Sequence, residues 1–230
     1  MTAKKQSPAQ PGLKRIFIVD DHPIVRQGLA KLLSDEEGLA VCGEAENARE
    51  AFQAIGKLKP DLAIVDISLS GKTGLELIKD IRSHYPELPV LVMSMYDELI
   101  YAERALRAGG RGYIMKQQGG KILVQAIRQV LSGQVYVSPK ISASILDRLS
   151  AGRTKLARSP VENLTEREFE VFQLISQGLA TREIAEQLHV SVKTVEVHRI
   201  HIKAKLQVKE GPALMHYAIS WEATQRQRVS

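Results

Sequence analysis

Short apolar runs alternate with segments of helical periodicity between residues 15 and 132. The five runs, each short enough to be a buried strand, are RIFIV (15–19), LAVCGEA (39–45), DLAIV (61–65), PVLVM (89–93) and RGYIM (111–115). Between the first two, residues 23–34 place their apolar side chains on one helical face, and Pro23 suits the first turn. Strands that alternate with helices five times predict a five-stranded parallel sheet with helices on both faces, a doubly wound α/β domain over residues 14–133.

This alternation stops after Gly133. Residues 134–162 mix Ser, Pro, Gly and Arg around one apolar patch at 141–149, and are interpreted as a linker with room for a single helix. Helical periodicity without strand-like runs then occupies residues 163–224. We therefore expect a second, small all-α domain there.

The second domain begins with a helix-start signal. In LTERE, Thr165 is the expected N-cap and Glu168, three residues later, completes a capping box. The helix that follows should end near Gly178 and bury Phe169, Phe172 and Ile175. Three further helices are expected at about 181–188, 192–206 and after residue 212.

Composition narrows the class of protein. With 230 residues and 44% hydrophobic residues, the chain can fill two cores, and the single cysteine, Cys42, fits a reducing compartment. No apolar stretch reaches the roughly 18 residues that a membrane span needs, and the N-terminus lacks the apolar region of a signal peptide. The expected location is the cytoplasm, without a membrane partner.

The net charge of +6 is uneven along the chain. Up to Gly133 there are 18 Lys and Arg against 16 Asp and Glu, whereas the shorter remainder has 14 against 10. The C-terminal part is the better candidate for binding a polyanion.

Acidic side chains follow two of the predicted strands. Asp20 and Asp21 come after the first and Asp66 after the third, so they converge if these strands are neighbours, because ligands meet such sheets at the carboxyl ends of the strands. Three close carboxylates repel one another, and Mg²⁺ is the cation expected to hold them. Ser94 follows the fourth strand and Lys116 the fifth.

This set of groups suits phosphoryl transfer to a carboxylate. Asp66 would attack in line while Lys116 and Mg²⁺ neutralise oxygens of the incoming group. A single Asp at a strand end is usually a helix cap or a solvated turn residue. Five polar residues at the ends of four strands make that explanation insufficient.

The predicted helix at 192–206 has two distinct faces. One buries Val195, Ile202 and Leu206; the other presents Lys193, Val197, Ile200 and Ala204, with Glu196 and Lys203 on its flank. In a major groove, Lys193 can reach a guanine, Glu196 a cytosine amino group, and Val197 or Ile200 a thymine methyl.

Hydroxyl residues near helix starts can fix the register on DNA. Thr181, Ser191 and Thr194 can hydrogen-bond phosphates, although Thr181 and Ser191 also serve as N-caps. Arg199 lies near the buried face and is assigned to a phosphate or an acid. His198 is interpreted as a packed or capping residue.

Long motifs of both halves match a known family. IFIVDDHPIVRQGL, LAIVDISLSGKTGLELI, VLVMSMYDE and ALRAGGRGYIMK resemble the receiver domain of two-component response regulators, and LTEREFEVFQLISQGLATREIAEQLHVSVKTVEVHRIHIKAKL resembles the LuxR-type helix-turn-helix. Together they resemble the NarL/FixJ family over roughly residues 14–218. The implied fold is a flavodoxin-like receiver followed by a helix-turn-helix domain.

The resemblance also implies partners and roles. Asp66 would accept a phosphoryl group from a sensor histidine kinase, and Asp20, Asp21 and the backbone carbonyl of Ser68 would join it around Mg²⁺. Ser94 and Lys116 would hold the phosphate, and Tyr113 would be the aromatic switch. The chain would then be a regulator of transcription, not an enzyme, and would work with double-stranded promoter DNA and RNA polymerase. The last helix carries an apolar stripe expected to be exposed and to form an isologous homodimer contact through Leu214, Ala218 and Trp221.

Two hypotheses concern switching. Phosphorylation would draw Ser94 and Lys116 onto the new oxygens, opening space that Tyr113 fills, and would release a recognition helix that the unphosphorylated receiver occludes. The bulk of Tyr96, two residues after Ser94, is expected to shield the phosphoaspartate from water.

Some positions depart from the family pattern, and three other classes of protein are alternatives. Ser70 stands where receivers often have Pro, Gly110 replaces a frequent Ala, and Gln117 and Gln118 follow the lysine where an acid is common.

Two other classes of protein each need a feature that this chain lacks. A haloacid-dehalogenase-type phosphatase needs a second Asp at position 68, where this chain has Ser68, and a flavodoxin-like binder needs a loop rich in Ser, Thr and Gly where DDHPIV stands. A constitutive DNA-binding regulator that ignores phosphorylation remains the third alternative.

Overall fold

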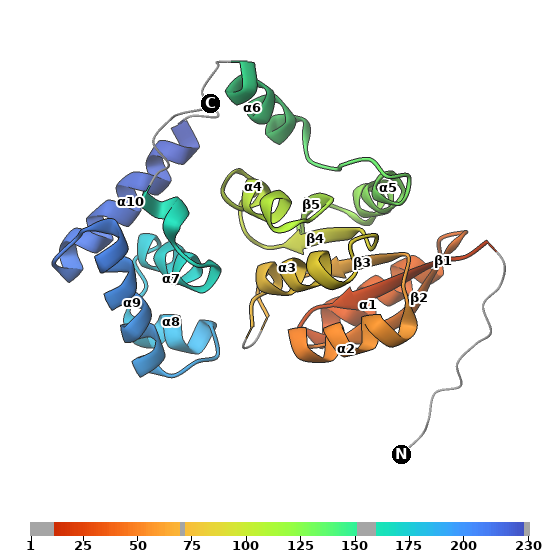
Figure 1. Ribbon diagram of the computed structural model, residues 1–230, viewed down its shortest axis with the longest axis horizontal. Coiled ribbons are helices and arrows are strands. Elements are labelled where there is room, and N and C mark those ends of the chain that lie inside the picture. Colours follow the sequence, from red (N-terminus) through yellow and green to blue (C-terminus); the bar gives the residue numbers. More distant parts are fainter. Residues whose placement is uncertain (1–11, 70–71, 151–159, 228–230) are drawn as a thin grey trace.

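Five strands form one parallel sheet in the order β2-β1-β3-β4-β5 (Figure 1). The computed structural model describes residues 12–69, 72–150 and 160–227. The strands are β1 (Lys14–Val19), β2 (Leu39–Ala45), β3 (Leu62–Val65), β4 (Val90–Ser94) and β5 (Gly112–Met115). Each of the five predicted apolar runs is a strand, and the prediction of a doubly wound parallel sheet is confirmed.

Helices cover both faces of this sheet. They are α1 (Pro23–Ser34), α2 (Ala48–Leu58), α3 (Gly74–His84), α4 (Glu98–Ala108) and α5 (Gly120–Leu131). Alternate side chains of β1 point to opposite faces: Ile16 and Ile18 pack in the core with α1 and α5, while Phe17 and Val19 pack on the side of α2, α3 and α4. Burial on both faces explains why the strands read as continuous apolar runs.

The first residues of the predicted linker pair with the last strand of the receiver sheet. Tyr136 bridges to Gly112 of β5, and its carbonyl accepts a hydrogen bond of 2.9 Å from the Tyr113 amide. The predicted helix is present as α6 (Pro139–Ser150), which starts two residues before the apolar patch and buries Ile141. A short 3₁₀ turn, η1 (Pro160–Asn163), follows.

Four helices form the C-terminal domain, α7 (Glu166–Ser176), α8 (Thr181–Gln187), α9 (Val192–Leu206) and α10 (Gly211–Gln227). The capping box at Thr165 and Glu168 is present in both directions. The expected cap at Thr181 is wrong by one residue: Ala180 is the N-cap, and its amide donates to the Glu183 carboxylate at 2.6 Å.

Helix α7 is buried on almost every side. Besides Phe169, Phe172 and Ile175, it buries the polar side chains of Glu166, Glu168, Glu170 and Gln173. In Figure 1, α7 to α10 lie beside α3 and α4, on the side of the sheet away from α1. Helix α7 therefore packs against its own domain and against the receiver at the same time.

The apolar stripe of α10 does not face solvent as predicted. Leu214 and Ala218 are fully buried, and the Trp221 ring lies 5.7 Å from that of Phe169 and 5.6 Å from that of Phe172, edge to face in both cases. These residues complete the core around α7, so the dimer contact assigned to Leu214, Ala218 and Trp221 is corrected to an internal packing contact.

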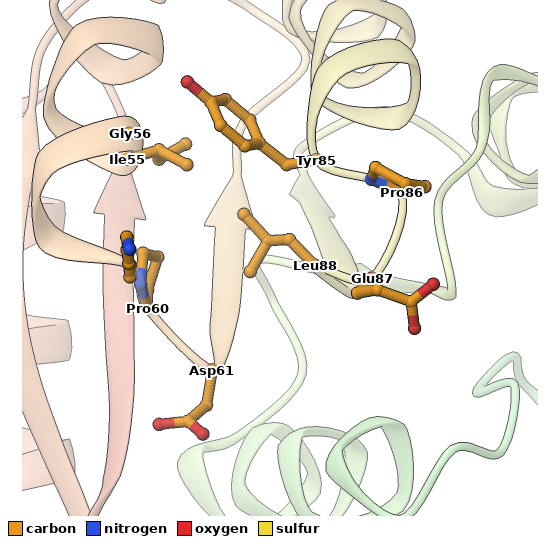
Figure 2. Close-up of a pocket in the computed structure, with 9 residues that line it drawn as sticks. Ile55, Gly56, Pro60, Asp61, Tyr85, Pro86, Glu87 and Leu88 are labelled. Atoms are coloured by element: carbon orange, nitrogen blue, oxygen red, sulfur yellow. The ribbon is translucent and has the colours of Figure 1, made fainter.

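A cavity of about 450 Å³ lies at the amino ends of β3 and β4, between the end of α2 and the loop that follows α3 (Figure 2). It is lined by Ile55, Gly56, Lys59, Pro60, Asp61, Tyr85, Pro86, Glu87 and Leu88. Because Asp61 precedes β3 and Asp66 follows it, this cavity is at the opposite end of the strands from the predicted acidic site.

Candidate functional site

The sheet order brings the predicted acidic residues together. β1 pairs with β3, with Val19 opposite Val65, so Asp20 and Asp66 leave adjacent strands side by side. Both carboxylates are buried, and the Lys116 ammonium after β5 lies 2.6 Å from Oδ2 of each. Residues from three strand ends thus meet as predicted at the carboxyl edge of the sheet.

The acidic cluster has a fourth member, His22, that was not predicted from the sequence. His22 Nδ1 lies 2.7 Å from Asp21 Oδ1 and 3.2 Å from Asp20 Oδ1. One potential ligand atom each of Asp20, Asp21, His22 and Asp66 falls within 4.8 Å of all the others. The signal in the sequence was its position directly after Asp20 and Asp21. In the structure His22 is the N-cap residue of α1, at the same strand end as the two acids.

The oxygens of this cluster fit a hard cation. Oδ1 of Asp66 is buried and makes no hydrogen bond to any residue that the structure describes. Carboxylate oxygens are the ligands that Mg²⁺ prefers, and leaving one orphaned in a buried position is costly without a partner. The donor set therefore fits the expected ion.

Burial and charge act in opposite directions on the ionisation of the pair. Burial raises the pKa of Asp66 to about 6, against the nearby Lys116 charge, which lowers it, while the Asp20 carboxylate raises it further. For Lys116, burial lowers the pKa, but the Asp66 and Asp20 carboxylates outweigh it and the net pKa is raised. Lys116 therefore stays charged beside the acids.

Ser94 and two tyrosines form the wall next to Asp66. Ser94 ends β4, is buried, and its Oγ accepts a hydrogen bond of 3.2 Å from the Tyr96 amide. The Tyr113 hydroxyl donates to the Tyr96 carbonyl at 2.8 Å, and its ring is only 1% exposed. The Tyr113 ring is therefore buried in this conformation, and its movement on switching remains a prediction.

Tyr96 lies close to the acceptor residue. Burial raises the pKa of Tyr96 to about 12, the charges of Glu170 and Asp66 raise it further, and a hydrogen bond with Ser68 opposes them. This hydrogen bond places the Tyr96 hydroxyl beside Ser68, two residues after Asp66. The shielding itself remains a prediction.

The loop after Asp66 is constrained by a glycine at its far end. A Cβ on Gly74 would lie 1.8 Å from the Asp66 carbonyl oxygen, so the first turn of α3 packs directly on the acceptor backbone. Ser68 lies in this loop, while Ser70 and Gly71 fall outside the described residues. The effect of Ser70, in place of the frequent Pro, on this loop lies outside the described residues, and the Ser68 carbonyl ligand remains a prediction.

Helix α9 has the two faces predicted from the sequence. Val195, Ile202 and Leu206 are buried, whereas Val197 is 42% and Ile200 59% exposed. Lys193, Glu196 and Ala204 are also exposed, and Lys203 is half-buried on the flank. The helix therefore presents an apolar and charged surface to solvent. His198 is half-buried, and burial lowers its pKa, consistent with a packed residue.

The hydroxyl residues lie at helix starts. Ser191 caps α9 by accepting a 3.0 Å hydrogen bond from the Thr194 amide, and its hydroxyl lies 2.8 Å from that of Thr194. Thr181 is the first residue of α8. All three remain candidates for phosphate contacts.

The expectation that the receiver covers the recognition helix is wrong for this conformation. The residues that should meet base edges are exposed, while the receiver contacts α7: Arg104 of α4 lies 3.6 Å from the Phe169 ring centroid. The contact between the two domains is made by α7. The outer face of α9 therefore stays accessible to solvent.

The fold and the acidic cluster define a receiver domain joined to a helix-turn-helix domain, which is the architecture of a response regulator. Residues 16–128 match the family described as the response regulator receiver domain, and residues 162–218 match bacterial regulatory proteins of the luxR family. The two matches lie in the two domains that the fold separates.

Whole proteins of this architecture align with almost the entire chain. The oxygen regulatory proteins NreC of Staphylococcus carnosus and of Staphylococcus haemolyticus are each 37% identical over 209 residues, covering 89% of this chain and 96% of theirs. The structure of RcsB from Salmonella enterica serovar Typhimurium bound to promoter rprA has a TM-score of 0.58 and 29% identity, covering 90% of this chain and 98% of that one. This chain belongs to the NarL/FixJ family of response regulators.

The family matches make the chain a DNA-binding response regulator with a receiver and a LuxR-type domain.

Within the described residues, no helix is both long and apolar enough to span a membrane.

Proposed function

We propose that Asp66 accepts a phosphoryl group from the phosphohistidine of a sensor histidine kinase, and that this controls binding of the C-terminal domain to promoter DNA as a homodimer. The observation that supports it most directly is the Lys116 ammonium, 2.6 Å from both Asp66 and Asp20 in a buried pocket. In the transfer, the bond from phosphorus to the histidine nitrogen breaks and a bond to an Asp66 oxygen forms.

The pocket residues have separate tasks in this proposal. The Asp66 carboxylate is the nucleophile, and Lys116 lies on its Oδ2, which leaves Oδ1 for the metal ion. Lys116 and the Ser94 hydroxyl hold the oxygens of the bound phosphoryl group. Asp20, Asp21, Asp66 and the Ser68 carbonyl would hold Mg²⁺, with His22 beside them, and a bound Mg²⁺ neutralises charge on the transferred group.

Helix α9 supplies the DNA contacts. Lys193, Glu196, Val197, Ile200 and Lys203 would face base edges, and Thr181, Ser191 and Thr194 would contact phosphates. The RcsB structures include one bound to promoter rprA in the presence of the phosphomimetic BeF₃⁻ and one of two RcsB dimers bound to two parallel DNAs. By likeness to these, the chain would bind its promoter as a dimer. An action on RNA polymerase there belongs to the same proposal and rests on the family resemblance alone.

An experiment with an acyl phosphate separates the steps. The full chain is incubated with acetyl phosphate and Mg²⁺, and phosphoryl uptake is read from the intact mass while DNA retardation is followed in parallel. Wild type should gain one phosphoryl group and retard DNA at lower protein concentration, and Asp66→Asn should do neither. Equal DNA binding by treated wild type and Asp66→Asn would show a constitutive regulator instead.

A further inference from the structure

His22 is fixed beside the acidic cluster by hydrogen bonds of its backbone. Its amide donates to Asp20 Oδ1 at 2.9 Å, and its carbonyl accepts hydrogen bonds of 3.1 Å and 3.2 Å from the amides of Val25 and Arg26 in the first turn of α1. Its backbone is extended, at φ −90° and ψ 110°, as is usual before a proline. These contacts hold the residue at the strand end, next to the two carboxylates that precede it.

Helix capping does not explain a histidine at this position. The side chains that stabilise an N-cap are those of Ser, Thr, Asp and Asn, and within the described part of the chain the His22 side chain makes no capping hydrogen bond to α1. It is 63% exposed, so it adds little to the core. Its Nδ1 instead lies 2.7 Å from Asp21 Oδ1 and 3.2 Å from Asp20 Oδ1. A ring nitrogen is therefore directed at the cluster.

An orphaned oxygen in the buried part of the cluster points independently to a cation. Asp66 is 2% exposed, and its Oδ1 has no hydrogen-bond partner among the described residues, since Lys116 lies on Oδ2. One potential ligand atom each of Asp20, Asp21, His22 and Asp66 lies within 4.8 Å of the others. This spacing allows one ion to contact carboxylate oxygens and an imidazole nitrogen together.

A nitrogen among the oxygens changes which ions the cluster suits. Mg²⁺ takes oxygen ligands and water, whereas imidazole suits ions such as Ni²⁺ and Zn²⁺, and the affinity of a given site rises from Mn²⁺ through Co²⁺ to Ni²⁺. On the basis of the acceptor pocket proposed above, we propose that His22 is a nitrogen ligand of its metal site. It adds affinity for borderline transition-metal ions of the Co²⁺, Ni²⁺ and Zn²⁺ class that the carboxylates alone do not give. The same carboxylates would take Mg²⁺ without the imidazole.

Calorimetric titration of the full chain with Ni²⁺ and, separately, with Mg²⁺ at neutral pH measures the contribution of His22. His22→Ala should weaken Ni²⁺ binding by about tenfold or more and change Mg²⁺ binding by less than about twofold. His22→Asn, which keeps a favourable N-cap and offers an oxygen, should lose Ni²⁺ affinity in the same way. Asp66→Asn should weaken binding of both ions, which places them in the same pocket.

An exposed histidine outside the cluster supplies the matched control. His84, the last residue of α3, is exposed, and His84→Ala should leave the affinity for both ions unchanged. The visible absorption of bound Co²⁺ gives a second readout, because it depends on the ligand atoms. This spectrum should change in His22→Ala and His22→Asn and stay as in wild type in His84→Ala. Far-UV circular dichroism checks that each variant is folded.

Two results would overturn the ligand role. Equal losses of Ni²⁺ and Mg²⁺ affinity in His22→Ala would show that the imidazole only orients the carboxylates. Unchanged affinity for both ions would show that it contributes nothing to metal binding. Phosphoryl uptake from acetyl phosphate with Mg²⁺, read from the intact mass, is measured in parallel. Absence of uptake in wild type counts against the proposed function, whereas the titrations still decide the role of His22.

Discussion

The Lys116 ammonium lies 2.6 Å from Oδ2 of Asp66 and at the same distance from Asp20. It is 9% exposed, so in the unphosphorylated pocket it is the counter-ion of two buried acids. The same charge that would hold a phosphoryl group thus stabilises the resting pocket.

Replacing Lys116 with Met should destabilise the chain by about 3 kcal/mol at pH 7.5 without Mg²⁺, because breaking a buried pair leaves uncompensated charge. Urea unfolding measures the change, and added Mg²⁺ should restore part of it by binding the folded acids. Lys121→Met, at an exposed position of α5, is the control and should change stability by less than about 0.5 kcal/mol. A Lys116→Met chain as stable as wild type would show that the acids do not need this counter-ion.

Gly74→Ala should destabilise the receiver by more than about 3 kcal/mol, because its Cβ would lie 1.8 Å from the Asp66 carbonyl oxygen and the backbone of the acceptor loop must move. The phosphorylation rate with acetyl phosphate should fall as well. Gly28→Ala is the matched control: Gly28 is an exposed position in α1 with no atom within 4 Å of an added Cβ, so alanine there should stabilise by about 0.5–1 kcal/mol. Thermal unfolding of the two variants should therefore shift in opposite directions.

The residues of the acceptor pocket were predictable because parallel topology fixes where strand ends meet. Asp20, Asp66, Ser94 and Lys116 are separated by up to 96 residues in sequence, yet each follows a strand of a single sheet. Once the period-two and helical patterns give the element order, the carboxyl edge collects these side chains. The boundaries of α1 and α9 followed from the same patterns and their caps.

What the sequence could not show is which surfaces the two domains share. The apolar stripe of α10 appears exposed when the helix is considered alone, because its partner, α7, is some 40 residues earlier. Glu166 and Glu170 look like solvated charges, yet they are buried where α7 meets the receiver. Periodicity reports whether a helix has a buried side, and it does not identify the element that covers it.

The stability of the chain should fall as the pH rises from about 5 to 7, because Glu170 is buried with a raised pKa. Burial raises this pKa to about 7, against the attraction of Arg167, whose guanidinium lies 2.7 Å away. Below the unfolded pKa the protonated acid costs nothing extra, whereas above the folded pKa the full cost of burying the carboxylate applies, on the order of 3 kcal/mol.

Urea unfolding across this pH range checks the sign. Glu170→Gln should flatten the slope relative to wild type, and Glu186→Gln, on the exposed side of α8, is the matched control. Asp66, whose pKa is also raised, lowers the free energy of unfolding in the same direction up to about pH 6. Only the difference between wild type and Glu170→Gln therefore reports on Glu170. A slope unchanged by Glu170→Gln would assign the pH dependence to other groups.

Val197→Ala and Ile200→Ala should weaken DNA binding without changing the free energy of unfolding by more than about 0.5 kcal/mol. Both side chains are exposed on α9, so truncation removes little buried surface from the folded chain, but in a major groove each would lose contact with a base edge. A loss of about 1 kcal/mol each, roughly fivefold in affinity, is expected for a site selected from random DNA, measured by fluorescence anisotropy. Ile219→Ala, at a comparably exposed apolar position on α10, should leave affinity unchanged, so an equal loss for Ile219 and Ile200 would place the DNA on a different surface.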